Sequence, residues 1–341
     1  MKKSIGMFLT GLIVMTALHA QTFYVDPVNG SDQADGSSSA PFASLKRAAE
    51  NVTRYQGDTT VVIKLLPGLY VLDDKIVLSR EQKNASSSFI IEAAVMPDDT
   101  GWTPSEMPVI QSLSGNNSTT QFPHAAGFLV ATNNVSIRGL KFVGNANPAT
   151  KYYYPVTREA TIYTGLNISQ CYFVGERNSA PIQGAIWAHG HGTTITHCIF
   201  YGCKNALLLF NAIRNFSVTH SIIYGAYEAA VWFGPYISDF IFENNIVTQC
   251  NFFWLRPEGT YPAYRFSSSL IANNKHFMGV YLNSGGLAES ENRNQIEINI
   301  RKSGSVTLNE VTSDGMQKGY LNLSPNSDGH GYNAGILTTG N

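Results

Sequence analysis

Four ionisable residues in the middle of the chain carry side chains suited to acid–base chemistry. His189 and His191 each carry an imidazole, which titrates near neutral pH and can act as a general base. Arg256 can stabilise the negative charge that develops when β-elimination removes a proton next to a carboxylate. We predict a catalytic set of His189, His191, Arg256 and Glu258. The alternatives are that both histidines make turn hydrogen bonds, or that Lys204 or Arg214 is the base.

A second chemistry is hydrolysis by two carboxylates, which must lie roughly 5 to 9.5 Å apart. Glu228, Glu243 and Glu258 could supply such a pair if successive repeats of the chain stack on one another. The alternative is that these glutamates are solvated surface residues.

Three aromatic residues are placed where their side chains could stack on the sugar rings of a ligand. We expect Trp187, Phe210 and Tyr236 to point outward on one face, with Arg256 beside them and the insertion 257–264 as a wall. Contiguous apolar surface on a protein of this kind usually marks binding, and aromatic rings can stack on sugars. The alternative is that an inserted loop covers these rings.

Metal sites have weaker support. His197 and His220 occupy equivalent positions in consecutive repeats and could hold a metal, although a mixed polar ladder explains them equally well. Asp26, Asp32 and Asp35 lie in a Gly/Ser-rich loop where turn capping is the default role of aspartate. We therefore expect no cofactor, with calcium at this loop as the alternative.

These residues are positioned by a repeat of about two dozen residues. Each repeat unit has two apolar positions five residues apart, usually followed by glycine, and successive units are offset by 31, 27, 23, 24 and 24 residues. The six units are VSIRGLKFVGN from Val135, LNISQCYFVGE from Leu166, TTITHCIFYGC from Thr193, FSVTHSIIYGA from Phe216, FIFENNIVTQC from Phe240 and YRFSSSLIANN from Tyr264.

The repeat predicts an all-β fold, a right-handed parallel β-helix, which is a solenoid of stacked coils. Short strands with alternating apolar residues cannot close a core alone, but coils stacked at about 4.8 Å bury one another's columns. Phe142, Phe173 and Phe200 should then form one inward ladder, with Cys171 over Cys198 in another. We expect the four cysteines to be buried free thiols. The leucine-rich repeat has the same period, but its consensus is missing.

The ends of the chain complete the predicted organisation. Residues 1–20 have a basic start, an apolar run and a small residue at Ala20, which is typical of a cleaved signal peptide without a lipobox cysteine. Residues 21–341 form a single domain: an N-terminal cap (21–60) with a capping helix from Pro41 to Val52, coils (61–311) that end in two strands over 296–311, and a closing segment (312–341). The tail from Ser324 should loop over the last coil.

Composition restricts the partners. The formal net charge is −1 and only 14% of residues are charged, which argues against nucleic acid and membrane surfaces. The apolar run of the signal peptide is too short to span a bilayer. We therefore expect a secreted or periplasmic monomer that is not inserted in a membrane.

The stretch FYVDPVNGSDQADGSSSAPFASLKRAAE (23–50), followed by VIKLLPGLY, resembles the start of secreted right-handed β-helix proteins of the pectate-lyase-like superfamily. The resemblance implies the same fold over the mature chain and a carbohydrate-active role. It transfers no catalytic residue, because the Asn-Ala-Asp-Gly-Phe-Ala-x-Lys stretch of one lyase branch is missing. Gly190-His191-Gly192 matches the polygalacturonase branch, but no aspartate pair precedes it.

The function expected from this resemblance is that of an exported polysaccharide lyase or glycoside hydrolase acting on an extracellular glycan. The alternative is a non-catalytic β-helix that binds glycan or serves as a structural or adhesive module at the cell surface.

Overall fold

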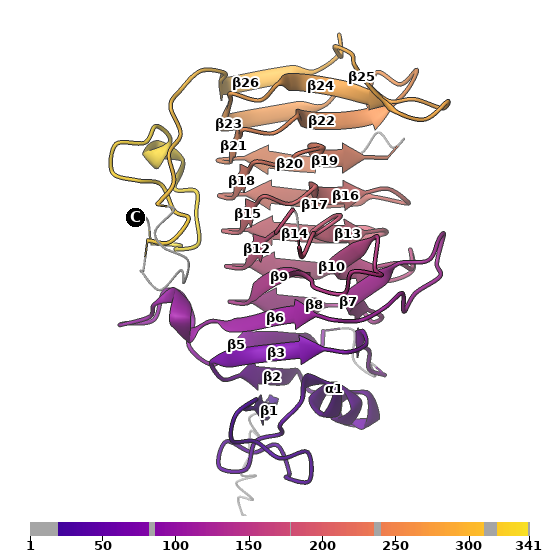
Figure 1. Cartoon of the computed structure of the whole chain (residues 1–341), viewed down its shortest axis with the longest axis vertical. Helices are drawn as coiled ribbons and strands as arrows, with labels where there is room; N and C mark the ends of the chain where they lie inside the picture. The colour runs from indigo at the N-terminus through magenta and orange to yellow at the C-terminus, as the bar shows by residue number, and fades with distance from the viewer. Residues whose placement is uncertain (1–19, 82–85, 178, 235–239, 310–318, 340–341) are drawn as a thin grey trace, which may run out of the picture.

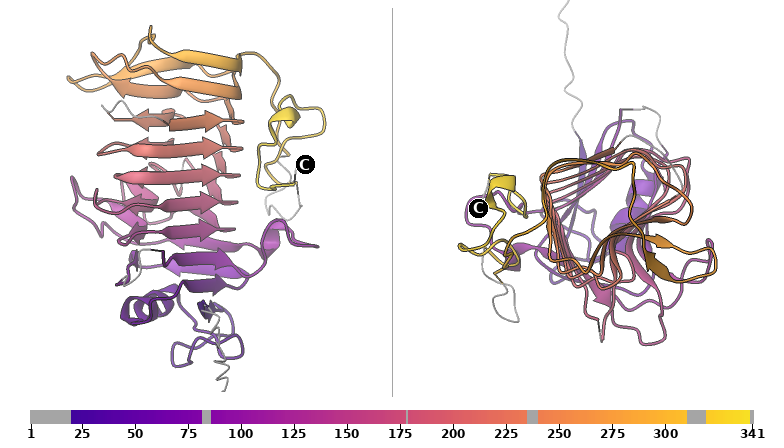
Figure 2. Two further views of the ribbon diagram at one scale, coloured as in Figure 1. Left: turned by 180° about the vertical axis from the view of Figure 1, so that it is seen from behind. Right: turned by 90° about the horizontal axis from the view of Figure 1, so that it is seen from above.

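The structure is a computed structural model that describes residues 20–81, 86–177, 179–234, 240–309 and 319–339. The proposed signal peptide, Tyr236 and part of the predicted closing segment therefore lie outside the described residues. The predicted parallel β-helix is confirmed: coils stack along one axis, and their outlines superimpose when the molecule is seen from above (Figures 1 and 2).

Each coil contributes up to three strands, which pair in parallel with the next coil to build three faces, called A, B and C here (Figure 1). Face A consists of β1 (Gln21–Val25), β2 (Val61–Leu65), β5 (Phe89–Ala93), β8 (Val135–Arg138), β11 (Leu166–Ser169), β14 (His191–Thr196), β17 (Arg214–Thr219), β20 (Phe240–Glu243), the first half of β23 (Arg265–Ala272) and β26 (Ile296–Arg301). Face B consists of β3 (Gly68–Leu72), β6 (Pro108–Ser112), β9 (Lys141–Asn145), β12 (Tyr172–Val174), β15 (Ile199–Tyr201), β18 (Ile222–Tyr224), β21 (Ile246–Thr248) and the second half of β23. Face C consists of β4 (Ile76–Leu78), β7 (Ala125–Val130), β10 (Tyr153–Arg158), β13 (Ile186–Ala188), β16 (Asn205–Leu209), β19 (Ala229–Phe233), β22 (Phe252–Pro257), β24 (His276–Tyr281) and the antiparallel β25 (Leu287–Glu289).

The predicted inward columns of faces A and B are confirmed. Phe142, Phe173 and Phe200 are directly paired, and their rings stack with centroids 4.9 and 5.0 Å apart. Ile223 continues this column on the next coil. The four cysteines are free and buried, as predicted.

The corner between faces A and B holds a polar ladder. Gln170, His197, His220 and Asn244 all have a positive φ, which lets the chain turn sharply there. The rings of His197 and His220 stack 4.9 Å apart, and His220 Nδ1 donates to the carbonyl of Tyr332. The two histidines therefore stack as a ladder requires, and their binding of a metal stays untested. Among the described residues, no three His, Cys, Asp or Glu side chains gather where they could hold a metal.

The lower end of the stack is covered by α1 (Leu45–Arg54). The predicted start at Pro41 is wrong, because the side chain of Ser44 caps the helix and Phe42 bridges to β1 instead. Leu45 and Val52 lie on the buried side of the helix, as the apolar spacing predicted. No helix in the described ranges is long and apolar enough to cross a membrane.

The C-terminal segment does not loop over the last coil, so that prediction is wrong. It runs back along face B, where Gln170 donates to the carbonyl of Ile336 and the backbone N–H of Thr338 donates to Asp98 (Figure 1). The second predicted closing strand is also missing from the described part of 296–311, where only β26 forms. The reason lies in face B itself, whose outward column is apolar and needs a cover; this column is Tyr172, Ile199, Ile222, Ile246 and Leu270, all buried against the C-terminal segment.

Phe173 sits between two stacked rings, so its replacement by alanine leaves a cavity that rigid coils cannot fill. We expect Phe173→Ala to lower the free energy of unfolding by about 3–5 kcal/mol, measured by urea denaturation. Ile241→Ala is the control, since Ile241 is 53% exposed and its loss should change stability by less than about 0.5 kcal/mol. Equal effects of the two changes would contradict the ladder.

Candidate functional site

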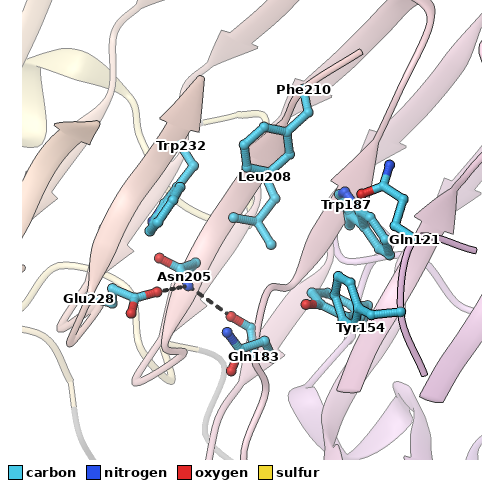
Figure 3. Close-up of a pocket in the computed structure, with 10 residues that line it drawn as sticks. Gln121, Tyr154, Gln183, Trp187, Asn205, Leu208, Phe210, Glu228 and Trp232 are labelled. Atoms are coloured by element: carbon cyan, nitrogen blue, oxygen red, sulfur yellow. Dashed lines mark hydrogen bonds between the residues drawn. The ribbon is translucent and has the colours of Figure 1, made fainter. Parts of the chain in front are cut away.

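Face C presents an outward column in the middle of the stack. Strand pairing places Trp187 directly beside Leu208, Leu208 beside Trp232, and Trp232 beside Leu255. Side chains on one face of neighbouring parallel strands lie about 4.8 Å apart. Trp187 and Trp232, separated by one strand, therefore flank Leu208 from either side (Figure 3).

The register predicted for this face was wrong. The expectation that Trp187, Phe210 and Arg256 all point outward would set Ile186 beside Leu209 and Leu255. Instead, Ile186 pairs with Leu207, and the same inward column continues to Trp254. Side chains alternate between the two sides of a strand, so a register error of two residues in β16 still leaves Phe210 on the outer side. A register error of one residue in β22 turns every side chain of that strand to the opposite side. Arg256 consequently points inward.

Arg256 is fully buried and does not line an outer groove, so its predicted position is wrong. Its guanidinium donates to Ser290 Oγ at 2.8 Å and to the carbonyls of Glu291 and Thr260. Burial lowers the pKa of Arg256. The insertion 257–264 thus closes over the arginine rather than forming the wall of a shared groove.

A pocket of about 230 Å³ lies on face C around Leu208 (Figure 3). Aromatic and amide side chains dominate its lining, which consists of Gln121, Phe122, Tyr154, Gln183, Trp187, Asn205, Leu208, Phe210, Glu228 and Trp232. The predicted Trp187 and Phe210 are both among them. Tyr154, Leu208 and Trp232 were missed. They lie on β10, β16 and β19, whose bounds the repeat pattern alone does not give.

The tryptophans of the pocket are backed by further rings. Phe122 stacks on Trp187 with ring centroids 5.7 Å apart, and Tyr281 stacks on Trp232 at 5.1 Å. Trp187 is only 3% exposed, so for this residue the alternative holds, namely that a loop covers the ring. Trp232 and Phe210 remain partly exposed, and such fixed rings offer a ligand apolar area at little conformational cost.

The opposite edge of the pocket is polar. Asn205 Nδ2 donates to Glu228 Oε2 at 2.7 Å and to the carbonyl of Gln183 at 3.0 Å (Figure 3). Lys204 pairs with Glu228 Oε1 at 3.1 Å. Glu228 is the one carboxylate among the described lining residues, and the lysine compensates its charge.

Two buried polar atoms in the lining have no hydrogen-bond partner: Asn205 Oδ1, an acceptor, and Trp232 Nε1, a donor. An unpaired buried polar group costs free energy, so each calls for a partner outside the chain, such as water or a ligand. A hydroxyl group can satisfy both atoms, since it donates and accepts.

His189 lies behind the pocket rather than in its lining. It is buried, its Nδ1 accepts from the backbone N–H of Asn211 at 3.1 Å, and its Nε2 meets the side-chain amide of Gln121 at 3.0 Å. Burial lowers the pKa of His189 to about 4, so the ring is neutral at neutral pH. Both ring nitrogens are occupied, and its role as base stays a prediction that this geometry does not favour.

The remaining predicted residues are not brought into the pocket. His191 is half-buried at the start of β14, and Glu258 is exposed and accepts from the backbone N–H of Asn283. Tyr236 lies outside the described residues. Among the described lining, the pocket therefore gathers two of the seven predicted site residues, Trp187 and Phe210.

All three aspartates considered for calcium accept hydrogen bonds from the backbone, and two of them cap turns. Asp26 accepts from the backbone N–H groups of Val28 and Asn29, and Asp35 accepts from Ser37. These two carboxylates have the capping role expected as the default. Asp32 accepts from Ser44, the N-cap of α1, and so joins its loop to the start of the helix.

The neutral form of His189 makes stability depend on pH. The pKa of His189 is about 4 in the fold against an ordinary value of 6.5, so the unfolded chain binds the extra proton first as pH falls. We expect the free energy of unfolding to decrease between about pH 6.5 and pH 4. His189→Gln should reduce this slope in urea denaturation. It should leave a residual slope from His197, whose pKa is also lowered to about 4 by burial; an unchanged slope would contradict the assignment.

No protein-family model and no curated protein matches this chain. Among solved structures, a rhamnogalacturonan lyase is 12% identical, with a TM-score of 0.49 over 87% of this chain and 84% of that one. A lacto-N-biosidase from Eubacterium ramulus is 10% identical, with a TM-score of 0.45 over 83% and 68%. A pectate lyase is 13% identical, with a TM-score of 0.42 over 90% of each chain. With TM-scores below 0.5 and identities this low, these similarities assign neither a family nor a reaction to the chain.

Proposed function

We propose that the face C pocket binds a glycan, with one sugar ring packed against Leu208 and Trp232. The observation that carries the proposal is the pair of unpaired buried atoms, Asn205 Oδ1 and Trp232 Nε1, in an aromatic lining. Sugars combine apolar C–H faces with hydroxyl groups, so one molecule can cover the rings and satisfy both atoms.

The charge of the pocket favours a neutral sugar. Glu228 is already compensated by Lys204 at 3.1 Å, so no free cation in the described lining is left to pair with a sugar carboxylate. Burying an unpaired carboxylate beside Glu228 would be unfavourable. A neutral oligosaccharide of an extracellular matrix also fits the export signal proposed for residues 1–20.

Replacement of Trp232 tests the proposal. Trp232→Ala removes both the stacking surface and the Nε1 donor, and we expect affinity to fall by at least about tenfold, which corresponds to ~1.4 kcal/mol. Trp232→Phe keeps a ring and should lose less. Binding is measured by tryptophan fluorescence titration with cellohexaose, xylohexaose, mannohexaose and hexagalacturonate.

Ile241→Ala serves as the matched control, because Ile241 is an exposed apolar residue on face A. It should bind like the wild type. Absence of binding to all four oligosaccharides, or equal affinities of Trp232→Ala and wild type, would remove the proposal.

A lyase or hydrolase activity is the second candidate, supported by the contact of Glu228 with Lys204 at the pocket edge. A carboxylate beside an ammonium group can exchange a proton with a bound substrate. Hydrolysis by two carboxylates has less support, because the described lining offers only Glu228.

Glu228→Gln separates the two candidates, since the amide can still accept from Asn205 but cannot act as an acid or base. If the site only binds, affinity should change by less than about fivefold, which is ~1 kcal/mol. If Glu228 is catalytic, reducing ends or the ultraviolet absorbance of unsaturated products should appear with the wild type and fall by at least about a hundredfold in the variant. Glu243→Gln, on face A, is the control and should change neither readout.

A further inference from the structure

A buried contact between His124 and Glu159 lies directly beneath the aromatic lining of the pocket. His124 is fully buried, and the side chain of Glu159 is 9% exposed. His124 Nε2 is 3.1 Å from Glu159 Oε1, while His124 Nδ1 is 2.8 Å from the carbonyl oxygen of Phe122. Neither residue lines the pocket itself.

The contacts of His124 fix the number of protons on the pair. A backbone carbonyl only accepts, so Nδ1 must carry a proton. Nε2 faces a carboxylate, so a hydrogen bond there needs a second proton, on the ring or on the carboxyl group. Burial raises the pKa of Glu159, but hydrogen bonds from His124, Thr120 and Ser118 outweigh it and lower the pKa overall. With the carboxylate ionised, this hydrogen bond would require the second proton on the ring, as an imidazolium.

The contact between His124 and Glu159 stabilises the hairpin 118–124, which forms one wall of the pocket. Ser118 and His124 bridge across the hairpin, and Ser118 Oγ donates to Glu159 at 2.9 Å. Gln121 and Phe122, at the tip between them, both line the pocket. Loss of the His124–Glu159 contact therefore loosens the wall that carries Phe122.

The His124 ring also contacts two aromatic residues behind that wall, Trp187 and Tyr154. The His124 ring packs in a T-shaped arrangement with the rings of Trp187 and Tyr154, with centroids 5.0 and 5.4 Å apart. A cation beside aromatic rings in a dry site is attracted by them, so the protonated ring stabilises both neighbours in their places.

We propose that His124 and Glu159 are positioning residues that hold the Phe122 wall on Trp187 only while the pair keeps its shared proton. This inference rests on the proposed glycan site for its effect on affinity, but the proton itself can be observed without a ligand. As pH rises and the proton leaves, Nε2 presents a lone pair to the carboxylate and the hairpin loses its fastening.

Other ionisable groups around the pair define which controls are needed. Tyr154 packs against the His124 ring, and His189 approaches from the next coil through Gln121. Arg158, adjacent to Glu159, is buried and donates to the carbonyl of His189 at 2.5 Å. These three groups stay in place when Glu159 alone is replaced.

Glu159→Gln is the discriminating variant. The glutamine amide can donate to a neutral His124 Nε2, and its carbonyl can still accept from Ser118, so the hairpin stays fastened without the extra proton. For the wild type we expect affinity for the tightest neutral hexasaccharide of the panel above to fall at least about tenfold from about pH 6 to about pH 10. The affinity of Glu159→Gln should stay nearly constant. Glu243→Gln should follow the wild type.

Nitrogen-15 NMR of the unliganded full chain gives the second readout. At neutral pH His124 should show two protonated ring nitrogens in the wild type and one in Glu159→Gln. A single protonated nitrogen in the wild type overturns the inference. Coinciding pH profiles of wild type and Glu159→Gln, or a wild-type affinity that does not fall at high pH, also overturn it. If no hexasaccharide binds, the proposed function fails, and the NMR result alone decides whether the pair holds its proton.

Discussion

The parallel pairing of one coil with the next is the constraint on which the rest of the structure depends. It sets each residue directly over its counterpart one coil away, at about 4.8 Å, and leaves no freedom to adjust a single strand. The stacked rings of Phe142, Phe173 and Phe200 and the stacked imidazoles of His197 and His220 are direct results. The pocket is another, because Trp187, Leu208 and Trp232 are neighbours only through this pairing.

The outward columns that this pairing produces are covered differently on faces B and C. On face B the outward column is apolar, and the C-terminal segment covers it. On face C the hairpin that ends at His124 covers Trp187 but leaves Trp232 and Phe210 partly open. The coils of a solenoid have nearly the same backbone, so its faces differ mainly in the segments that cover them. Those segments form the glycan pocket that we propose.

Charged side chains have different partners inside the stack and at the pocket edge. Arg158 and Arg256 both occupy the inner side of face C, where backbone carbonyls and hydroxyls accept from most of their donors, while Arg158 Nη1 and Arg256 Nε have no partner. Glu228 and Lys204 pair at the pocket edge, where solvent reaches them. An arginine on the inner side thus stabilises a corner of the coil, whereas the edge pair remains available to a ligand.

The sequence by itself determined the coil architecture, because apolar residues that recur every two dozen positions can be buried only by stacking. It also identified Trp187 and Phe210 as outward aromatic residues and Asp26 and Asp35 as turn caps. Only the tertiary structure decided the register of face C, where unequal loops make counting along the chain unreliable. A slip of one residue moved Arg256 from the surface to the interior. Tertiary structure also decided which covering segment meets which face, and so brought Gln121 and Phe122 into the pocket lining and His124 beneath it. Contacts between segments far apart in sequence leave no periodic signal.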